Sequence, residues 1–346
     1  MILVTIYDIN GKALSGNSNS LSHGNSVIGN TYDGMSNEYI TMVQANYNSF
    51  LSEIKGDFNK IPIIVHTDHH HRSIESVFKL CNDMVDWYEI SKIINLGDTC
   101  SNVFDEENLA KYRGYAENNI PLNKRLEIYG NNDFWDADTD QKYSVNQKRL
   151  SPYFYNVDAR RYSNNGFFTV IDDYRNVKYL VISDFEDNTF KKRISTAQAK
   201  FIMEELSAKD GYDIILLSHV PFDTTTLTSR DASYSAYTET FLYDTTAQAS
   251  LMDMIKARRN NTSGTFVDCY GVEHPYDFTD VSSKLLMSLH GHAHFEAYHT
   301  FENSITQFIF DWFNGNTFYF GYVDRENMKF KCWKNEIGIE ALEIDI

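Results

Sequence analysis

The stretch IPIIVHTDHHHR, residues 61–72, joins an apolar run to a cluster of potential metal ligands. The run from residue 61 to residue 65 has the length of one buried strand and is too short for a typical helix. It is followed by Asp68 and His70, a carboxylate and an imidazole two positions apart. Both groups are good ligands for borderline divalent metals such as zinc, manganese or iron. The stretch therefore predicts a strand that carries metal ligands at its carboxyl end.

Four further apolar runs end in residues that can supply oxygen or nitrogen ligands. In open α/β sheets, ligands gather at the carboxyl ends of the strands, so we expect all five strand ends to face one site. Glycines in these blocks relieve crowding where the backbone must turn sharply. The runs and their endings are 93–96 before Gly97-Asp98, 126–129 before Gly130-Asn131-Asn132-Asp133, 214–218 before His219, and 285–289 before His290-Gly291-His292-Ala293-His294.

The composition of the 346-residue chain narrows its function class. Its 31 basic and 48 acidic residues give a net charge of −17, which argues against a general binder of duplex nucleic acid, because such proteins need a basic surface. Bound metal cations would still attract phosphate to an acidic cleft. The four cysteines are scattered, without a C-x-x-C pair, which is typical of a reduced protein without disulfides.

No membrane span or export signal is expected from the sequence. No run approaches the roughly 18 apolar residues of a transmembrane helix. The apolar residues 1–7 lack the basic segment that begins a signal peptide. We therefore expect a soluble, cytoplasmic protein whose oligomeric state is open. Export by another route, or assembly into an extracellular or phage particle, is the alternative.

Residues 1–60 precede the first ligand block and are expected to form an N-terminal extension. Residues 2–7 resemble a strand, and residues 16–30 are rich in glycine, serine and asparagine, as in a loop. Ser36 is a good N-cap for a helix that runs to Ile54 with its apolar residues near one face. Two interpretations are open: the helix packs on the rest of the chain, or it anchors the protein to a partner such as a phage or cell-surface assembly.

The remaining pattern predicts alternating helices and strands. We expect helices at 74–87, 105–117, 195–206 and 246–258, a hairpin formed by 166–171 and 178–182, and a loop at 260–264. Aromatic runs at 308–313, 317–323 and 328–333 are interpreted as the closing strands of a second sheet. The long polar segment 222–284 separates two ligand blocks, so it is either a lid or substrate wall, or a surface elaboration without contact to substrate.

In order and spacing, the five ligand blocks resemble the motifs of the calcineurin-like metallophosphoesterases. About thirty residues separate each of the first three blocks, which is room for a strand–helix crossover. The resemblance covers residues 61–346 and implies an α/β fold, a four-layer sandwich of two mixed β-sheets flanked by helices. The matching motifs are Asp68-x-His70, Gly97-Asp98, Gly130-Asn131, His219 and Gly291-His292-x-His294.

The resemblance also implies a dinuclear metal centre that hydrolyses phosphate esters, in small molecules or in phosphorylated polymers. Two divalent ions (manganese, iron, zinc or magnesium, with manganese favoured) would hold a bridging hydroxide and clamp the phosphoryl group. The implied ligands are Asp68, His70 and His294 for the first ion, Asn131, His219 and His292 for the second, and Asp98 as the bridge. The candidate catalytic residues are Asp98, Asn131, Asn132 and His219.

Asn132 departs from the family pattern, which usually has a histidine here that is taken to assist the leaving group. Asparagine can donate a hydrogen bond but cannot deliver a proton, and loss of a general acid slows a reaction by about 10²–10⁴-fold. The substrate would then have a good leaving group, another residue would supply the proton, or the reaction would be slow. We therefore favour a phosphodiesterase over a monoesterase. The alternative function is a non-catalytic scaffold or binding module that keeps the fold.

The histidines near the motifs also have structural interpretations. His66 is expected to be a hydrogen-bonded core residue, and His290 is expected to lie beside the ligands. His69 and His71 alternate away from His70, although either one could approach substrate or replace the missing acid. Arg72 either neutralises phosphate or is exposed at a helix start, and the thiol of Cys100 is expected to be a packing group.

Overall fold

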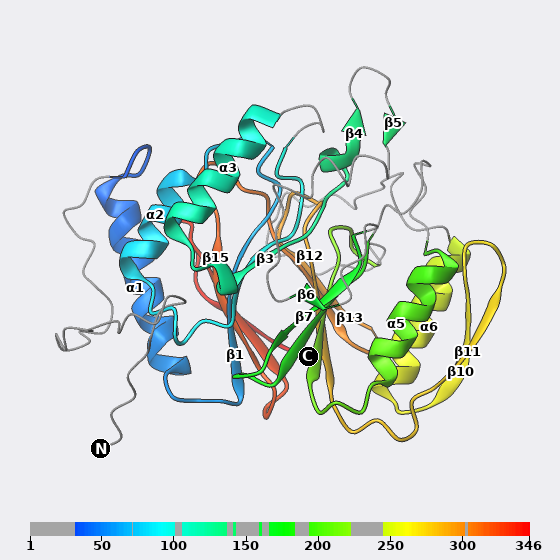
Figure 1. The fold of residues 1–346 in the computed structure, drawn as a ribbon. Helices are drawn as coiled ribbons and strands as arrows, with labels where there is room; N and C mark the ends of the chain where they lie inside the picture. The colour runs from blue at the N-terminus through cyan, green and yellow to red at the C-terminus, as the bar shows by residue number, and fades with distance from the viewer. Residues whose placement is uncertain are drawn as a thin grey trace, which may run out of the picture.

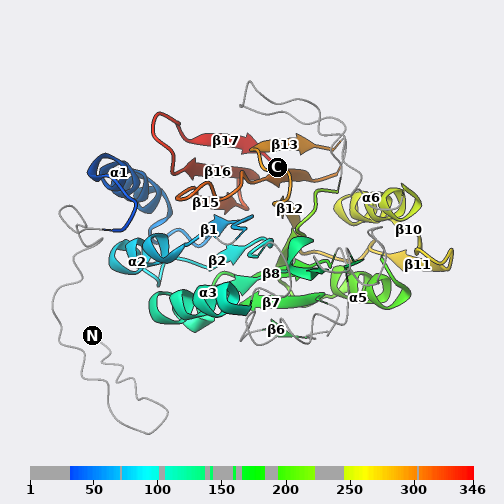
Figure 2. The same cartoon turned by 90° about the horizontal axis from the view of Figure 1, so that it is seen from above.

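The structure, a computed structural model, describes residues 32–70, 72–100, 106–136, 141–142, 159–160, 166–183, 194–222, 245–301 and 304–346. Within these ranges two β-sheets lie face to face, and helices cover the outer face of each sheet (Figures 1 and 2). The four layers confirm the predicted α/β sandwich. The strand expected at 2–7 and the loop expected at 16–30 lie outside the described residues.

The first sheet is organised around β1 (Lys60–His66), the strand predicted from the opening stretch. β1 lies between the parallel β2 (Lys92–Asn95) and the antiparallel β15 (Tyr319–Asp324). Beyond β2 the sheet continues with β3 (Arg125–Glu127), and beyond β15 with β16 (Lys329–Lys334) and β17 (Leu342–Asp345). The six strands therefore run in the mixed order β17-β16-β15-β1-β2-β3.

The prediction that residues 317–323 and 328–333 close a second sheet is wrong, because β15 and β16 belong to the sheet of β1. β15 is apolar on both faces. Phe320 and Tyr322 face the helices, whereas Tyr319 and Val323 face the other sheet. Such a strand fits an interior position of the sandwich, where both of its faces are buried.

The second sheet has seven described strands in the order β13-β14-β12-β9-β8-β7-β6. The predicted hairpin is formed by β7 (Phe168–Asp172) and β8 (Val177–Val181), and the predicted ligand-bearing strands are β9 (Asp213–Leu217) and β12 (Leu285–His290). β14 ends at Ile309, so residues 310–313 of the expected strand lie in a loop. The remaining strands are β6 (Ala159–Arg160), β13 (Ala297–Thr300) and β14 (Thr306–Ile309).

Two small hairpins lie outside the main sheets. β4 (Trp135–Asp136) pairs with β5 (Gln141–Lys142), and β10 (Ser263–Val267) pairs with β11 (Glu273–Asp277). The loop predicted at 260–264 therefore ends earlier than expected, because Ser263 and Gly264 pair with β11.

Five α-helices are described, and each overlaps a predicted one. Ser36 caps α1 by accepting a hydrogen bond from the Tyr39 backbone N–H at 3.1 Å, as expected. α2 stops three residues before its predicted end, because Val85 has extended backbone angles. The helices are α1 (Asn37–Ile54), α2 (Glu75–Met84), α3 (Glu106–Asn119), α5 (Thr196–Ser207) and α6 (Thr245–Arg259), and short 3₁₀ turns occur at η1 (Leu122–Lys124) and η2 (Asn132–Phe134).

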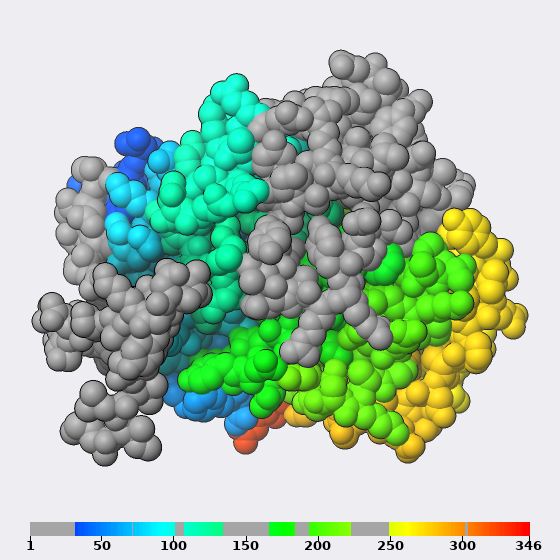
Figure 3. Space-filling model, viewed as in Figure 1, coloured from blue at the N-terminus to red at the C-terminus, as the bar shows by residue number. Residues whose placement is uncertain are grey.

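Three apolar layers hold the sandwich together. The alternation along β1 places Ile61, Ile63 and Val65 between the two sheets and Ile64 under the helices α1 to α3. α5, α6 and the β10–β11 hairpin cover the outer face of the second sheet. In the space-filling view, α3 is visible on the left and α5 with the hairpin on the right of the same face (Figure 3).

α1 lies against the first sheet, with the Phe50 ring stacked on Phe320 at 5.6 Å. This is the contact expected of a helix that packs on the rest of the chain. None of the helices in the described ranges combines the length and the hydrophobicity that a transmembrane segment needs.

Candidate metal centre

The seven predicted ligands lie just beyond the carboxyl ends of five strands, three from the first sheet and two from the second. Their side chains form two groups, within each of which the potential ligand atoms lie within 4.8 Å of one another. The first group is Asp68, His70 and His294, and the second is Asp98, His219 and His292. Asn131 joins the second group, because its Oδ1 lies 3.2 Å from His219 Nε2.

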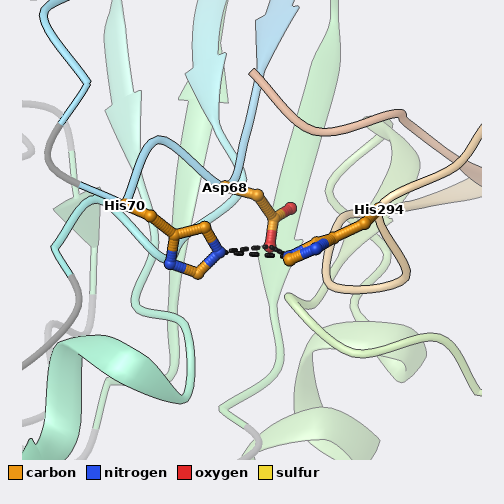
Figure 4. A group of neighbouring side chains, drawn as sticks. All are labelled: Asp68, His70 and His294. Carbon is orange, nitrogen blue, oxygen red and sulfur yellow. Dashed lines mark hydrogen bonds and ion pairs between the residues drawn. The ribbon is translucent and has the colours of Figure 1, made fainter. Parts of the chain in front are cut away.

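In the first group, two imidazoles point toward one carboxylate (Figure 4). Asp68 Oδ1 lies 3.3 Å from His294 Nε2 and 3.9 Å from His70 Nε2, and the two ring nitrogens are 3.1 Å apart. Asp68 is fully buried, and its Oδ1 accepts no hydrogen bond. A buried anionic oxygen without a donor is costly, so this arrangement fits a cation between the three side chains.

The other oxygen of Asp68 is held in place by the protein. Asp68 Oδ2 accepts hydrogen bonds from Thr67 Oγ1 at 2.7 Å and from the backbone N–H of His292 at 2.9 Å. The bond from His292 ties the end of β1 to the end of β12, and both bonds leave Oδ1 directed at the histidines. Partners of this kind are what orient metal ligands in known sites.

In the second group, the tautomer of His219 is determined by a backbone contact. His219 Nδ1 lies 2.7 Å from the carbonyl oxygen of Leu96, so the nitrogen must donate. In the neutral ring, the lone pair of Nε2 then faces Asp98 Oδ2 at 3.3 Å and Asn131 Oδ1 at 3.2 Å. At these distances the lone pairs of the three atoms repel one another. A cation among them would remove this repulsion.

Asp98 lies between the two groups. Its Oδ2 is 3.3 Å from His219 Nε2 and 3.9 Å from His70 Nε2. Both oxygens also accept hydrogen bonds from Asn132, Oδ1 from the backbone N–H at 2.7 Å and Oδ2 from the side-chain amide at 2.6 Å. Asp98 thus lies within 4 Å of a histidine from each group.

The backbone is strained at five of the seven predicted ligands. Asp68, His70, Asp98, His292 and His294 have φ between 46° and 67°, and they make up five of the eight non-glycine residues with positive φ in the described ranges. Side chains other than glycine rarely adopt this region, and such strain concentrates at functional sites. At these residues the strained backbone directs the side chains toward a common site.

The glycines of the ligand blocks permit a close approach of three chain segments. A Cβ on Gly130 would collide with the backbone N and the carboxylate of Asp98. A Cβ on Gly291 would collide with the side chain of Thr67 and lie 2.7 Å from Asp68 Oδ2. Gly97, at a φ of +100°, approaches Gly130 so closely that a Cβ would lie 2.5 Å from its backbone N. Each of the three positions therefore requires glycine.

The pKa shifts of Asp98 and His70 favour the forms that bind metal. For His294, by contrast, burial is outweighed by the hydrogen bond and charge of Asp68, which raise its pKa. Burial alone would raise the pKa of Asp98, but the neighbouring histidines, His219 first, hold that pKa well below its usual range. Burial lowers the pKa of His70, although Asp98 and Asp68 act in the opposite direction. An ionised carboxylate and a neutral imidazole are the ligand forms that divalent metals bind.

Asp133 holds the loop that carries Asn131 in place through hydrogen bonds. It accepts hydrogen bonds from the backbone N–H of Gly130 at 2.8 Å, from that of Cys100 at 3.0 Å and from the Cys100 thiol at 3.2 Å. Burial, together with the negative charge of Asp98, raises the pKa of Asp133. Cys100 is thus a buried packing group, as predicted.

Other predicted residues occupy structural positions. His66 is a buried core residue, as expected, and its Nδ1 lies 2.6 Å from His69 Nε2. His69 is itself buried, stacks on Phe313 at 4.7 Å and belongs to neither ligand group, which does not fit the hypothesis that it replaces the missing acid. His290 bonds to serine side chains next to the ligands. His71 lies outside the described residues.

Three contacts of the site were not predicted. The Leu96 carbonyl that orients His219 is a backbone group without a sequence signal. Trp312 stacks on the His294 ring at 5.2 Å, and the Arg72 guanidinium lies 4.1 Å from the centre of the Trp312 ring. The aromatic run around residue 312 was interpreted as a strand. Its aromatic composition was therefore the only sequence feature that pointed to a contact with the site.

The comparisons with known proteins rest on structure. No protein-family model matches the sequence, and no curated protein matches it by sequence. A dimetal phosphatase from Danio rerio superimposes with a TM-score of 0.51 at 9% identity, covering 82% of this chain and 98% of that one. The purple acid phosphatase PPD1 from yellow lupin (Lupinus luteus) seeds does so with a TM-score of 0.51 at 12% identity, covering 83% of this chain and 54% of that one.

The chain has the fold of these two phosphatases. The predicted metallophosphoesterase sandwich is thereby confirmed. At such low identities the likeness concerns the fold alone.

Proposed function

We propose that the protein is a metal-dependent phosphoesterase with two divalent ions at the ends of β1, β2, β3, β9 and β12. The observation that carries the proposal is the buried Asp68 Oδ1, which has no hydrogen-bond donor and faces two imidazole nitrogens. A second ligand group shares Asp98 with the first. Two phosphatases have the same fold, which supports this chemistry.

The donor set fits two ions. Asp68, His70 and His294 would hold the first, Asn131, His219 and His292 the second, and Asp98 both. When bound, two such ions make hydroxide available near neutral pH for in-line attack on phosphorus and neutralise the phosphoryl charge. A mixed set of carboxylate, amide and imidazole ligands suits manganese, iron or zinc, and we favour manganese over these and over magnesium.

The side chains of the protein position the reactants. Leu96 holds His219 with Nε2 directed at the site, and Thr67 holds Asp68. The Asn132 amide, which donates to Asp98 in this structure, can donate to a phosphate oxygen instead. Because this amide cannot deliver a proton, the reaction would favour esters with good leaving groups, and we propose a phosphodiesterase rather than a monoesterase.

The proposal is tested by hydrolysis of bis(4-nitrophenyl) phosphate with added manganese. We expect turnover that a chelator removes and manganese restores. The alternative function, a non-catalytic scaffold, predicts no turnover above that of free manganese at any metal concentration. The physiological ester, in a small molecule or a phosphorylated polymer, would then be sought with substrates of graded leaving groups.

Replacing Asn132 by histidine should speed the hydrolysis of esters with poor leaving groups most, because a proton donor would be restored. The gain should reach about 10²-fold for alkyl leaving groups and be small for 4-nitrophenolate. Asn132→Gln, which keeps an amide, is the matched control and should show no such trend. Equal effects of Asn132→His on good and poor leaving groups would refute a role for leaving-group protonation.

We further propose that residues 61–346 form the phosphoesterase unit, with 1–60 as an extension and 222–284 as a wall or lid beside the site. In the described part of that insertion, Leu251 and Met254 of α6 and Phe266 of β10 pack in the same core as the second sheet, which supports a fixed part of the fold rather than a moving lid for that part. Residues 223–244 lie outside the described ranges.

A further inference from the structure

A groove of about 460 Å³ lies next to the candidate metal centre. It is formed by the start of α1, the β14–β15 loop and the residues after β16. Its volume falls within the range of small-molecule sites, about 300–1,000 Å³. The lining is polar and aromatic rather than aliphatic, and includes Tyr39, Asp311, Trp312, Thr317, Asn335 and Glu336.

Trp312 connects the groove with the metal centre. Its indole lines the groove and also stacks on the ring of His294 at 5.2 Å with an angle of 11° between the planes. His294 in turn lies 3.3 Å from the buried oxygen of Asp68. An ester whose phosphoryl group lies between the two ligand groups can therefore extend along Trp312 into the groove.

Asn335 independently indicates that the groove binds a ligand. Its side chain is buried, with 1% of the residue exposed, and lines the groove. Its Oδ1 accepts a hydrogen bond from Asn46 Nδ2 at 3.1 Å, whereas its Nδ2 has no hydrogen-bond partner. Buried amide donors are nearly always paired, so this one is available for an oxygen acceptor.

The charges in the groove would repel a bound anion. Asp311 and Glu336 both pair with Lys334 at 2.6 Å, so one lysine serves two carboxylates and a net negative charge remains. A second phosphate in the groove would meet that charge. Hydroxyl groups, by contrast, can donate to the carboxylates and accept from Asn335.

We propose that the groove binds a neutral polyhydroxylated group, a sugar or polyol, that is esterified to the phosphate at the metal centre. The link to the phosphate rests on the proposed phosphoesterase function. The binding of the polyol itself rests on the groove alone, so the two are tested separately.

The first test compares two diesters with the same 4-nitrophenolate leaving group, one carrying methyl glucoside at O6 and the other hexanol. We expect kcat/KM to be about tenfold higher for the sugar ester, the effect of one or two well-placed hydrogen bonds. The ratio between the two substrates should fall toward one in Asn335→Leu and in Glu336→Gln. Glu336 is half exposed, so its variant tests the groove even if the buried Asn335→Leu fails to fold.

Glu343→Gln is the matched control. Glu343, like Glu336, is a partly exposed carboxylate paired at 2.6 Å with a lysine of β16, but it does not line the groove. Its variant should keep the wild-type ratio. A ratio near one in the wild type, or a high ratio that neither groove variant lowers, would overturn the groove proposal while leaving the phosphoesterase proposal intact.

The second test needs no metal. Saturation-transfer NMR on the chelator-treated protein, with methyl glucoside, methyl riboside and inositol as probes, should detect at least one of them, and Glu336→Gln should weaken the signal. If none of the three gives a signal, the groove does not bind a polyol. If a signal is lost in Glu336→Gln but neither diester is hydrolysed, the groove proposal stands and the phosphoesterase proposal fails.

Discussion

Replacing Asp98 by asparagine is expected to lower hydrolysis of bis(4-nitrophenyl) phosphate by at least about 10²–10³-fold, the range for loss of one group that stabilises a transition state electrostatically. The carboxylate lies 3.3 Å from His219 Nε2 and 3.9 Å from His70 Nε2, so it contacts both ligand groups. Asparagine has the same shape but lacks the charge that two cations would share. Initial rates at saturating manganese measure the effect.

The loss should arise from metal binding rather than from misfolding. Without metal, Asp98→Asn should stay folded but lose some stability, because its amide NH2 would face an Asn132 donor where a carboxylate oxygen now accepts. With manganese, the wild type should gain stability, by about 2.7 kcal/mol when the ion is present at 100 times its Kd, and the variant should gain clearly less.

Asp324→Asn is the matched control for Asp98→Asn. Asp324 is also a buried carboxylate, but it lies opposite Lys60 at the start of β1, at the far end of the sheet from the site. It caps a turn by accepting from the backbone N–H groups of Glu326 and Asn327, and asparagine can still do so. An equal loss of activity in both variants would show that the effect is not specific to the site.

Replacing Gly130 by alanine is expected to destabilise the protein by about 1–3 kcal/mol and to abolish metal binding. The added Cβ has no space, because it would collide with the backbone N and the carboxylate of Asp98. The β3 loop would have to move away from the β2 loop, and this movement would separate Asn131 from Asp98. Urea unfolding with chelator present measures the stability, and manganese titration measures the site.

Gly114→Ala is the control for the glycine substitution itself. Gly114 lies inside α3, and a Cβ there would meet no atom within 4 Å. Alanine in a helix interior should stabilise the protein by about 0.5–1 kcal/mol. The two variants should therefore shift unfolding in opposite directions. If Gly130→Ala were as stable as Gly114→Ala and still bound metal, the close approach of the loops would not be needed.

The ligand-bearing strand ends were predictable because local signals coincide there. An apolar run, a turn glycine and a metal-binding side chain follow one another within a few residues at β2, β3 and β12. The backbone strain at Asp68 and His70 was not predictable, because it is imposed by the hydrogen bonds of their backbone N–H groups to the carbonyls of Gly97 and Asp98. Such contacts form only once the sheet has assembled.

The errors occurred where pairing is long-range. β15 is apolar on both faces, so its sequence does not say which sheet it joins, and its partner β1 lies near the other end of the chain. The groove was not predictable for the same reason, because it depends on contacts between distant segments. Tyr39, Trp312 and Asn335 come from three distant segments, and only the packing of α1 and β16 beside the β14–β15 loop brings them together.

The central claim is that two cations bind among these seven side chains. It is tested most directly by counting the metal bound to the purified protein after saturation with manganese and removal of the excess. We expect two ions per chain in the wild type, and fewer than two in both Asp98→Asn and Asp68→Asn. Fewer than two ions in the folded wild type, or a count that neither substitution changes, would contradict it.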